Sequence, residues 1–135
     1  MTTLHAYYLP LDNYFSGRIE FDAYDHATAV EHIKTLIKLD EICQLQATLR
    51  SEEHGDTELI FWLDDGYFEG EGIDRNDDAS DVVNAISNKS EKLIAPLYGN
   101  CVVTAMNPST REVASLPSHA LETLTGLFLG RIKSA

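Results

Sequence analysis

Alternating apolar and polar residues predict strands in the first half of the chain. Between Gly17 and Tyr24 every second side chain is apolar, which is the pattern of a strand with one buried face. A second alternating stretch places Cys43, Leu45, Ala47 and Leu49 on one face. Residues 57–63 are its predicted hairpin partner, joined through the polar turn 51–56, where Gly55 permits a tight backbone.

The second strand of this hairpin carries large apolar residues on both faces. Leu59, Phe61 and Leu63 fall on one face, whereas Ile60 and Trp62 fall on the other. A strand buried on one face only would have polar residues at the latter positions. Either a helix covers Ile60 and Trp62, or they form an exposed apolar patch that would serve a structural homodimer.

Three segments have the apolar periodicity of amphipathic helices. The first follows Asp25, a predicted N-cap. The second is capped by Asp77 or Asp78 and must end before Pro96, because the residue preceding a proline avoids helical geometry. The third is capped by Ser118.

An opening strand, ahead of residues 11–21, and two further strands complete the predicted order. Residues 100–106 and 111–116 have strand character and flank a turn at 107–110. The order is therefore β-β-α three times over, without residue-level repetition between the units. It predicts an α+β fold in which a mostly antiparallel sheet has about three helices on one face, a two-layer sandwich. No linker divides the 135 residues, so we expect a single domain spanning 1–135.

The formal net charge of −12 is concentrated in one segment. The thirty residues from Glu52 to Asp81 contain twelve acids and one base, Arg75, whereas the other 105 residues hold ten acids and nine bases. Such a field repels nucleic acid and anionic membranes and attracts basic surfaces. We expect a basic protein as the partner, for example one that itself binds nucleic acid, and no direct binding to nucleic acid or membrane.

The cysteines and the first residues predict the compartment. The beginning of the chain lacks the basic and apolar regions of a secretory signal, and no window approaches the ~18 apolar residues of a membrane span. Cys43 and Cys101 then fit reduced core thiols. These features predict a cytoplasmic protein.

Motifs for catalysis or cofactor binding are not found in the sequence. CxxC, HExxH and GxSxG are missing, and the histidines are scattered at His5, His26, His32, His54 and His119. The glycines between residues 64 and 72 do not predict a phosphate loop, because the acids among them would repel an anion. We therefore predict no enzyme and no cofactor.

One acidic spacing resembles the start of a calcium loop. Asp74, Asn76 and Asp78 have its 1-3-5 spacing, but Ala79 and Ala85 stand where glycine and a bidentate acid are needed. We predict no metal site, and interpret the acids as a solvated loop whose charge also favours the start of the following helix.

The acidic loop at about 64–78 is interrupted by two aromatic residues, Tyr67 and Phe68, with Trp62 just before it. Aromatic side chains supply binding energy at interface centres, and surrounding charges steer the encounter. The pattern favours a non-enzymatic acidic binding protein that docks on a basic surface, as inhibitors, immunity proteins and DNA mimics do. The predicted partner-binding residues are Asp64, Asp65, Tyr67, Phe68, Glu69, Glu71, Asp74, Asp77 and Asp78.

Two stretches, which lie in about the first half of this chain, are similar to the start of antirestriction proteins that mimic DNA. These are LDNYFSGRIEF at 11–21 and DDGYFEG at 64–70, which match an aromatic strand with an acid-Tyr-x-x-Gly turn and a later acid-Tyr-Glu-Gly stretch. Here Phe68 separates Tyr67 from Glu69, and the acids cluster in one segment instead of following the chain. The resemblance implies a DNA-like charge surface. Because of these departures we do not assign the chain to that family.

Other interpretations remain beside the docking hypothesis. The aromatics can be core residues, with the acids serving solubility alone. A small-molecule-binding or enzymatic α+β domain would instead have a pocket between sheet and helices, with convergent polar groups. The structural homodimer through Ile60 and Trp62 is the third possibility.

Overall fold

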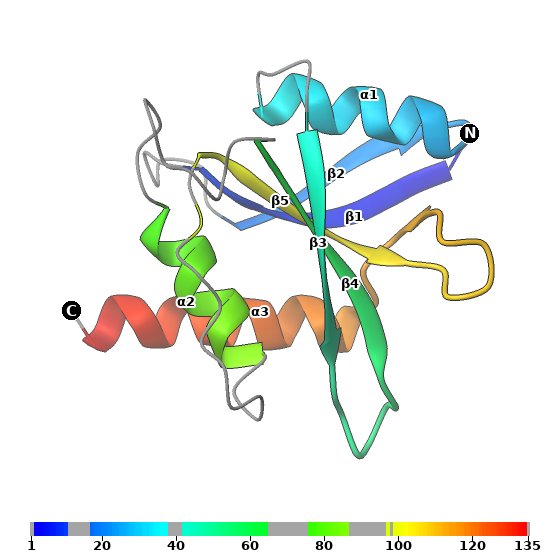
Figure 1. The fold of residues 1–135 in the computed structure, drawn as a ribbon. Helices are drawn as coiled ribbons and strands as arrows, with labels where there is room; N and C mark the ends of the chain where they lie inside the picture. Colours follow the sequence, from blue (N-terminus) through cyan, green and yellow to red (C-terminus); the bar gives the residue numbers. More distant parts are fainter. Residues whose placement is uncertain are drawn as a thin grey trace.

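A computed structural model of the chain describes residues 2–10, 17–37, 42–64, 76–86, 97 and 99–134, with the backbone alone at 43, 64, 78, 84 and 128–134. Its strands are β1 (Thr2–Leu9), β2 (Gly17–Ala23), β3 (Ile42–Leu49), β4 (Thr57–Asp64), β5 (Cys101–Met106) and β6 (Val113–Ala114). Its helices are α1 (His26–Ile37), α2 (Asp77–Ile86) and α3 (Ser118–Ser134) (Figure 1). The predicted α+β class is confirmed.

All six strands form one sheet, and neighbouring strands run antiparallel, as predicted. The order is β2-β1-β5-β4-β3, and β6 pairs with β5. β4 occupies one edge of β5, so β1 and β6 share the other edge: β1 pairs with its first half and β6 with its end. β6 has two residues, fewer than the return strand predicted at 111–116.

The segment after β6 closes the gap that β6 leaves beside β1. The His5 N–H donates to Ser115 Oγ at 2.8 Å, and the His5 carbonyl accepts from the Leu116 N–H at 2.9 Å. Both backbone groups of His5 therefore face the β5–β6 side of β1. Because successive residues of a strand direct their N–H and carbonyl groups to alternate edges, the orientation of His5 fixes the orientation of all residues in β1.

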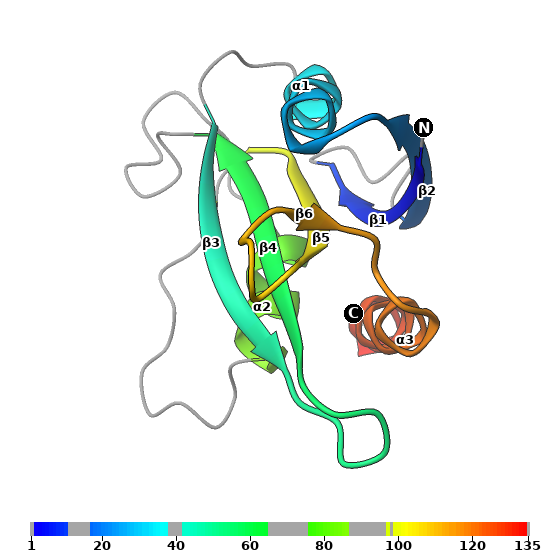
Figure 2. The same ribbon diagram turned by 90° about the vertical axis from the view of Figure 1, so that its right-hand side faces the viewer.

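Helices cover both faces of the sheet, so the prediction of a two-layer sandwich with helices on one face is wrong. On one face, Ile33 and Ile37 of α1 pack with Ile60 and Trp62. On the other face, α2 and α3 pack against the alternate strand residues, whose side chains point the opposite way, including Phe61. Figures 1 and 2 show α1 on one side of the sheet and α2 with α3 on the other. The physical reason is that all six residues of β5 are buried, as are both faces of β4, and a single helical layer would leave one apolar face in water.

Ile60 and Trp62 are covered by α1. Their exposed fractions are 0% and 1%, and the Trp62 indole N–H donates to Thr104 Oγ1 at 2.9 Å. They therefore do not form the exposed apolar patch on which the predicted homodimer interface depended. Trp62 is likewise unavailable as an aromatic anchor beside the acidic loop.

Asp25 caps α1, as predicted. Its Oδ1 accepts the Thr28 N–H at 2.9 Å, while the Asp25 N–H donates to Thr28 Oγ1 at 3.0 Å. The Thr28 backbone N–H, followed by the Thr28 hydroxyl, holds the pKa of Asp25 below its ordinary value. The carboxylate form thus stabilises the folded chain.

This cap predicts a pH dependence that Asp25→Asn should remove. Because the folded pKa of Asp25 is lowered, its charge-dependent contribution is present above the unfolded pKa and is lost as pH falls through the folded pKa. We expect Asp25→Asn to be less stable than the parent chain at pH 7, and the difference to shrink toward pH 3, in urea titrations at several pH values. A difference that stays constant over this range would contradict the capping role of the charge.

The other two helices begin differently from the prediction. α2 is capped by Asn76 and not by Asp77 or Asp78, because Asn76 Oδ1 accepts the Ala79 N–H at 2.9 Å. In α3, Ser118 is the first helical residue, and the Pro117 carbonyl accepts the first N–H groups, those of residues 120 and 121. The observed caps thus lie one or two residues before the predicted ones in both helices.

Candidate functional site

The acidic loop predicted at 64–78 is anchored at both ends on one end of the sheet. At its start, Asp64 closes β4 and pairs with Ile42. At its end, Asn76 is 3% exposed, and its side-chain Nδ2 donates to the carbonyls of Leu9 and Gly99, each at 2.8 Å. Leu9 pairs with the first residue of β5, which lies next to the end of β4. Asp64 and Asn76 therefore lie at the same end of the sheet.

A buried polar network fixes the second anchor. The Asn76 N–H donates to the Leu97 carbonyl at 2.8 Å, and the Ser80 hydroxyl donates to the Asn76 carbonyl at 2.8 Å. Ser80 Oγ also accepts the Leu97 N–H at 2.8 Å. With the cap to Ala79, every polar group of Asn76 has a protein partner. Its side-chain oxygen is thus committed to the helix cap, which removes the middle ligand of the calcium-like spacing.

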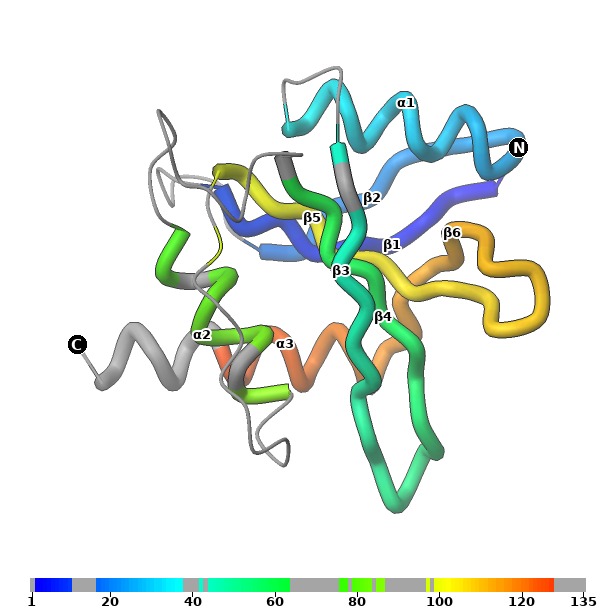
Figure 3. Tube along the Cα trace, in the orientation of Figure 1, coloured from blue at the N-terminus to red at the C-terminus, as the bar shows by residue number. Residues whose placement is uncertain are grey.

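The predicted partner-binding residues fall into two groups. Asp77 is exposed as the first residue of α2, and the backbone of Asp64 and Asp78 lies at the end of β4 and in the first turn of α2. The other predicted residues lie outside the described part of the chain, which Figure 3 draws in colour: Asp65, Tyr67, Phe68, Glu69, Glu71 and Asp74. The described residues thus define how the segment is held.

The described acids of the run are not all neighbours in the fold. Glu52, Glu53 and Asp56 are exposed in the turn between β3 and β4, at the opposite end of β4 from Asp64 (Figure 1). At about 3.4 Å per strand residue, the two ends are roughly 25 Å apart. The hairpin tip, defined as residues 52–56, is therefore separated from Asp64 by the length of β4.

Two histidines meet beside the hairpin tip. The rings of His54 and His119 stack at a centroid distance of 4.4 Å, inclined by 14°, and His119 Nε2 lies 3.1 Å from Thr57 Oγ1. The contact joins the tip to the first turn of α3. The scattered positions of the histidines in the sequence gave no signal for it. In the described part of the chain, no group of three His, Cys, Asp or Glu residues lies close enough to hold a metal ion.

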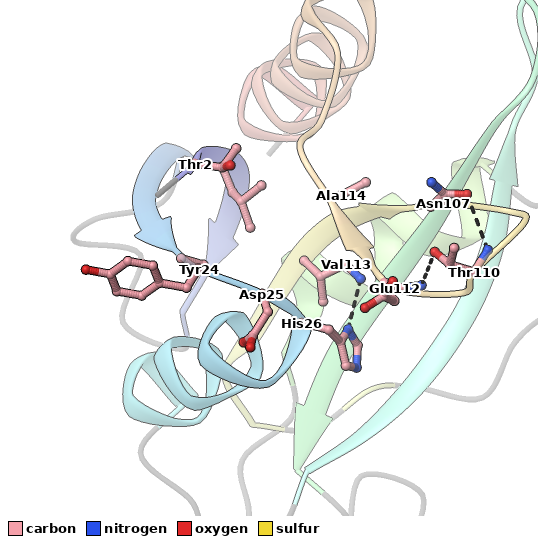
Figure 4. Close-up of a pocket in the computed structure, with 11 residues that line it drawn as sticks. Thr2, Tyr24, Asp25, His26, Asn107, Thr110, Glu112, Val113 and Ala114 are labelled. Carbon is pink, nitrogen blue, oxygen red and sulfur yellow. Dashed lines mark hydrogen bonds between the residues drawn. The ribbon is translucent and has the colours of Figure 1, made fainter.

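An open pocket of about 290 Å³ lies between the start of α1 and the β5–β6 turn (Figure 4). Three of its polar side chains already have roles in the fold. Asp25 caps α1, His26 Nδ1 accepts the Val113 N–H at 3.0 Å, and Asn107 Oδ1 accepts the Ser109 N–H at 2.9 Å. These contacts stabilise turns and do not pair a nucleophile with a base, so the pocket gives the enzymatic alternative no specific support.

Comparison with known proteins provides no functional assignment. No family model, curated protein or solved structure matches the chain. None of the helices in the described segments combines the length and apolar character of a membrane span. Function must therefore be inferred from the chain's own charges and contacts.

Proposed function

We propose that the chain is a non-enzymatic acidic binding protein whose 64–78 segment docks on a basic surface of a partner protein, in the manner of an inhibitor or immunity protein. The supporting observation is the concentration of charge: this segment holds seven acids and one base. A field of this density accelerates encounter with a basic surface and selects against acidic ones.

The two anchors support docking by this segment. Asp64 is held in the β3–β4 ladder, and Asn76 is bound to three backbone groups of the fold through its side chain. Fixed ends reduce the conformational entropy that a connecting segment loses when it binds. The anchors also present the flanking acids at one end of the sheet.

Tyr67 and Phe68 supply the apolar part of the proposed interface. With Trp62 buried under α1, they are the remaining aromatic residues of the predicted anchor. An aromatic side chain at the centre of a charged surface typically slows dissociation, whereas the charges mainly raise the association rate. The two contributions can therefore be measured separately.

The separation of the acids favours a local docking surface over extended imitation of DNA. A DNA mimic needs negative charge at phosphate-like intervals along a continuous surface. Here the hairpin tip and Asp64, where the proposed docking segment begins, lie at opposite ends of β4. The partner that fits best is a protein with one compact basic site.

Neutralising the loop should slow association with that partner. The tagged chain captures the partner from lysate of its own host at low salt, and mass spectrometry identifies it. Binding kinetics are then measured with four loop acids neutralised by Asp65→Asn, Glu69→Gln, Glu71→Gln and Asp74→Asn. We expect an association rate lower by about tenfold or more and a flatter dependence on salt.

A second variant, Tyr67→Ser with Phe68→Ser, should leave association nearly unchanged and speed dissociation by about tenfold or more. The double mutant thus reports on the aromatic contact separately from the charges. Unchanged binding in both variants would refute the proposal.

A further inference from the structure

The outer edge of β2 is a row of backbone groups that have no backbone partner among the described residues, and their direction can be derived from β1. The N–H and carbonyl of His5 bond to Ser115 and Leu116, on the side of β1 that faces away from β2. His5 is directly opposite Glu20 in the β1–β2 ladder. In an antiparallel pair, two opposite residues either both face each other or both face away. The N–H and carbonyl of Glu20 therefore face outward.

Every second residue of a strand directs its backbone groups to the same edge. Arg18 and Asp22, two residues on either side of Glu20, also direct their N–H and carbonyl groups outward. β2 is the last strand at its end of the sheet, and none of its outward groups has a backbone partner among the described residues. Figure 2 shows β2 beyond β1 at this end, with α1 and α3 to either side.

We propose that this edge pairs with the β2 edge of a second copy of the chain, in antiparallel register about a two-fold axis at Glu20. Glu20 is the central residue of the seven-residue strand, so this register overlaps its full length. It makes three hydrogen-bonded residue pairs from the outward groups, and joins two sheets into one continuous sheet. Such an isologous contact closes on itself and forms a dimer.

The side chains of β2 are complementary to themselves in this register. Arg18 lies opposite Asp22 of the second copy, and the reverse pair is made by symmetry, giving two pairs of opposite charge. Ile19 lies opposite Phe21 of the second copy on the α1 face, where both are half-buried and pack on the core. A shift of two residues in one direction places Glu20 opposite Asp22, and a shift in the other direction pairs Arg18 with Glu20. Either shift shortens the overlap to five residues of β2 and leaves two hydrogen-bonded pairs in place of three.

One pair opposes the contact. Glu20 faces Glu20 of the second copy at the axis, and like charges directly opposite are unfavourable. Each Glu20 carboxylate lies 3.8 Å from His5 Nδ1 of its own β1, and so is directed along its own sheet. The exposed Tyr24, at 73% the one large hydrophobic residue exposed among those described, follows β2 directly and lies at the end of the same edge. It adds an aromatic residue to the rim of the interface.

The test is the mass of the purified full chain as a function of concentration, by sedimentation equilibrium at physiological ionic strength. An interface of this size belongs to the weak class, so concentrations up to roughly 0.3 mM are needed. We expect a reversible monomer–dimer equilibrium. A chain that stays monomeric throughout, or gains mass only with another protein, would overturn the proposal.

Glu20→Pro isolates the backbone contact. The Glu20 N–H faces outward, so proline at this position removes a donor to the second copy and none from the β1–β2 ladder. We expect the dissociation constant of the dimer to rise by at least about tenfold while the circular dichroism spectrum is unchanged. Glu20→Gln is the matched control: it keeps the N–H, removes the like-charge pair, and should leave the dimer equally or more stable.

A charge exchange tests the register without proline. Arg18→Asp alone should weaken the dimer by roughly tenfold, because it places acids opposite Asp22. The double variant Arg18→Asp with Asp22→Arg restores opposite charges and should return the constant to within about threefold of the parent. If neither Glu20→Pro nor the charge exchange changed the dissociation constant, the dimer would form through another surface, which would refute the β2 interface.

Discussion

Replacing Asn76 by alanine is expected to lower the free energy of unfolding by about 3 kcal/mol, a large share of the stability of a domain of this size. The substitution removes the donors to the Leu9 and Gly99 carbonyls and the acceptor for the Ala79 N–H. These partners are left in a site where Asn76 itself is 3% exposed, so water replaces the lost bonds poorly. Urea or thermal unfolding followed by circular dichroism measures the loss.

Asn76→Asp separates the two functions of this side chain. Aspartate caps helices as well as asparagine does, so the bond to Ala79 is kept, but a carboxylate cannot donate to two carbonyls. We expect a loss at neutral pH at least as large as that of Asn76→Ala, because a charge is placed against carbonyl oxygens. Asp77→Asn, at the next and exposed position, is the control and should cost less than about 1 kcal/mol. Equal small losses at both positions would mean that Asn76 is only a helix cap.

Replacing Trp62 by alanine is expected to cost about 3–5 kcal/mol, the usual loss for a large buried aromatic side chain. The side chain is 1% exposed under α1, and its N–H is bonded to Thr104 Oγ1. Tyr24→Ala is the matched control, since Tyr24 is 73% exposed, and it should change stability by less than about 0.5 kcal/mol. Similar effects of the two substitutions would contradict the packing of α1 on the sheet.

The hydrogen bond of Trp62 can be measured apart from its volume. Trp62→Phe leaves the Thr104 hydroxyl without its buried donor, whereas Trp62→Phe combined with Thr104→Val replaces both partners with apolar groups. The double variant should therefore cost less than the sum of the two single ones. Trp62 is also the single tryptophan of the chain, so blue-shifted emission that acrylamide quenches weakly reports its burial in the unmodified protein.

Local patterns predicted the elements well because each depends on neighbouring residues. The alternation at 17–24 and 57–63, the helix after Asp25 and the turn at Gly55 are all properties of short segments, and the structure has β2, β4, α1 and a turn there. The alternation also assigned Ile60 and Trp62 to the face opposite Phe61, as observed. Which element covers that face depends on contacts distant in sequence, and no local pattern encodes them.

Asn76 shows how a local signal can be assigned to the wrong residue. Asparagine immediately before a helical stripe is a strong N-cap signal, but the predicted cap was Asp77 or Asp78. The donors of Asn76 reach Leu9 and Gly99, and this contact becomes visible only when β1 and the start of β5 are adjacent. For the same reason acids that form one segment of the sequence need not be neighbours in the fold: the hairpin separates residues 52–56 from Asp64 by the length of β4.

The most direct test of the proposed docking segment compares two variants that carry the same change of net charge at opposite ends of β4. The loop variant carries Asp65→Asn, Glu69→Gln and Glu71→Gln. The tip variant carries Asp56→Asn, Glu52→Gln and Glu53→Gln. Both lose three acids of the same types, so any difference between them reports position and not total charge.

The measurement is the association rate of each variant with the captured basic partner at low salt. If the 64–78 segment docks, the loop variant should associate more slowly than the parent chain by about tenfold, and the tip variant by less than about twofold. Equal slowing in both variants would show that net charge alone drives association, and no slowing in either would show that the acids do not take part; either result contradicts docking by the loop.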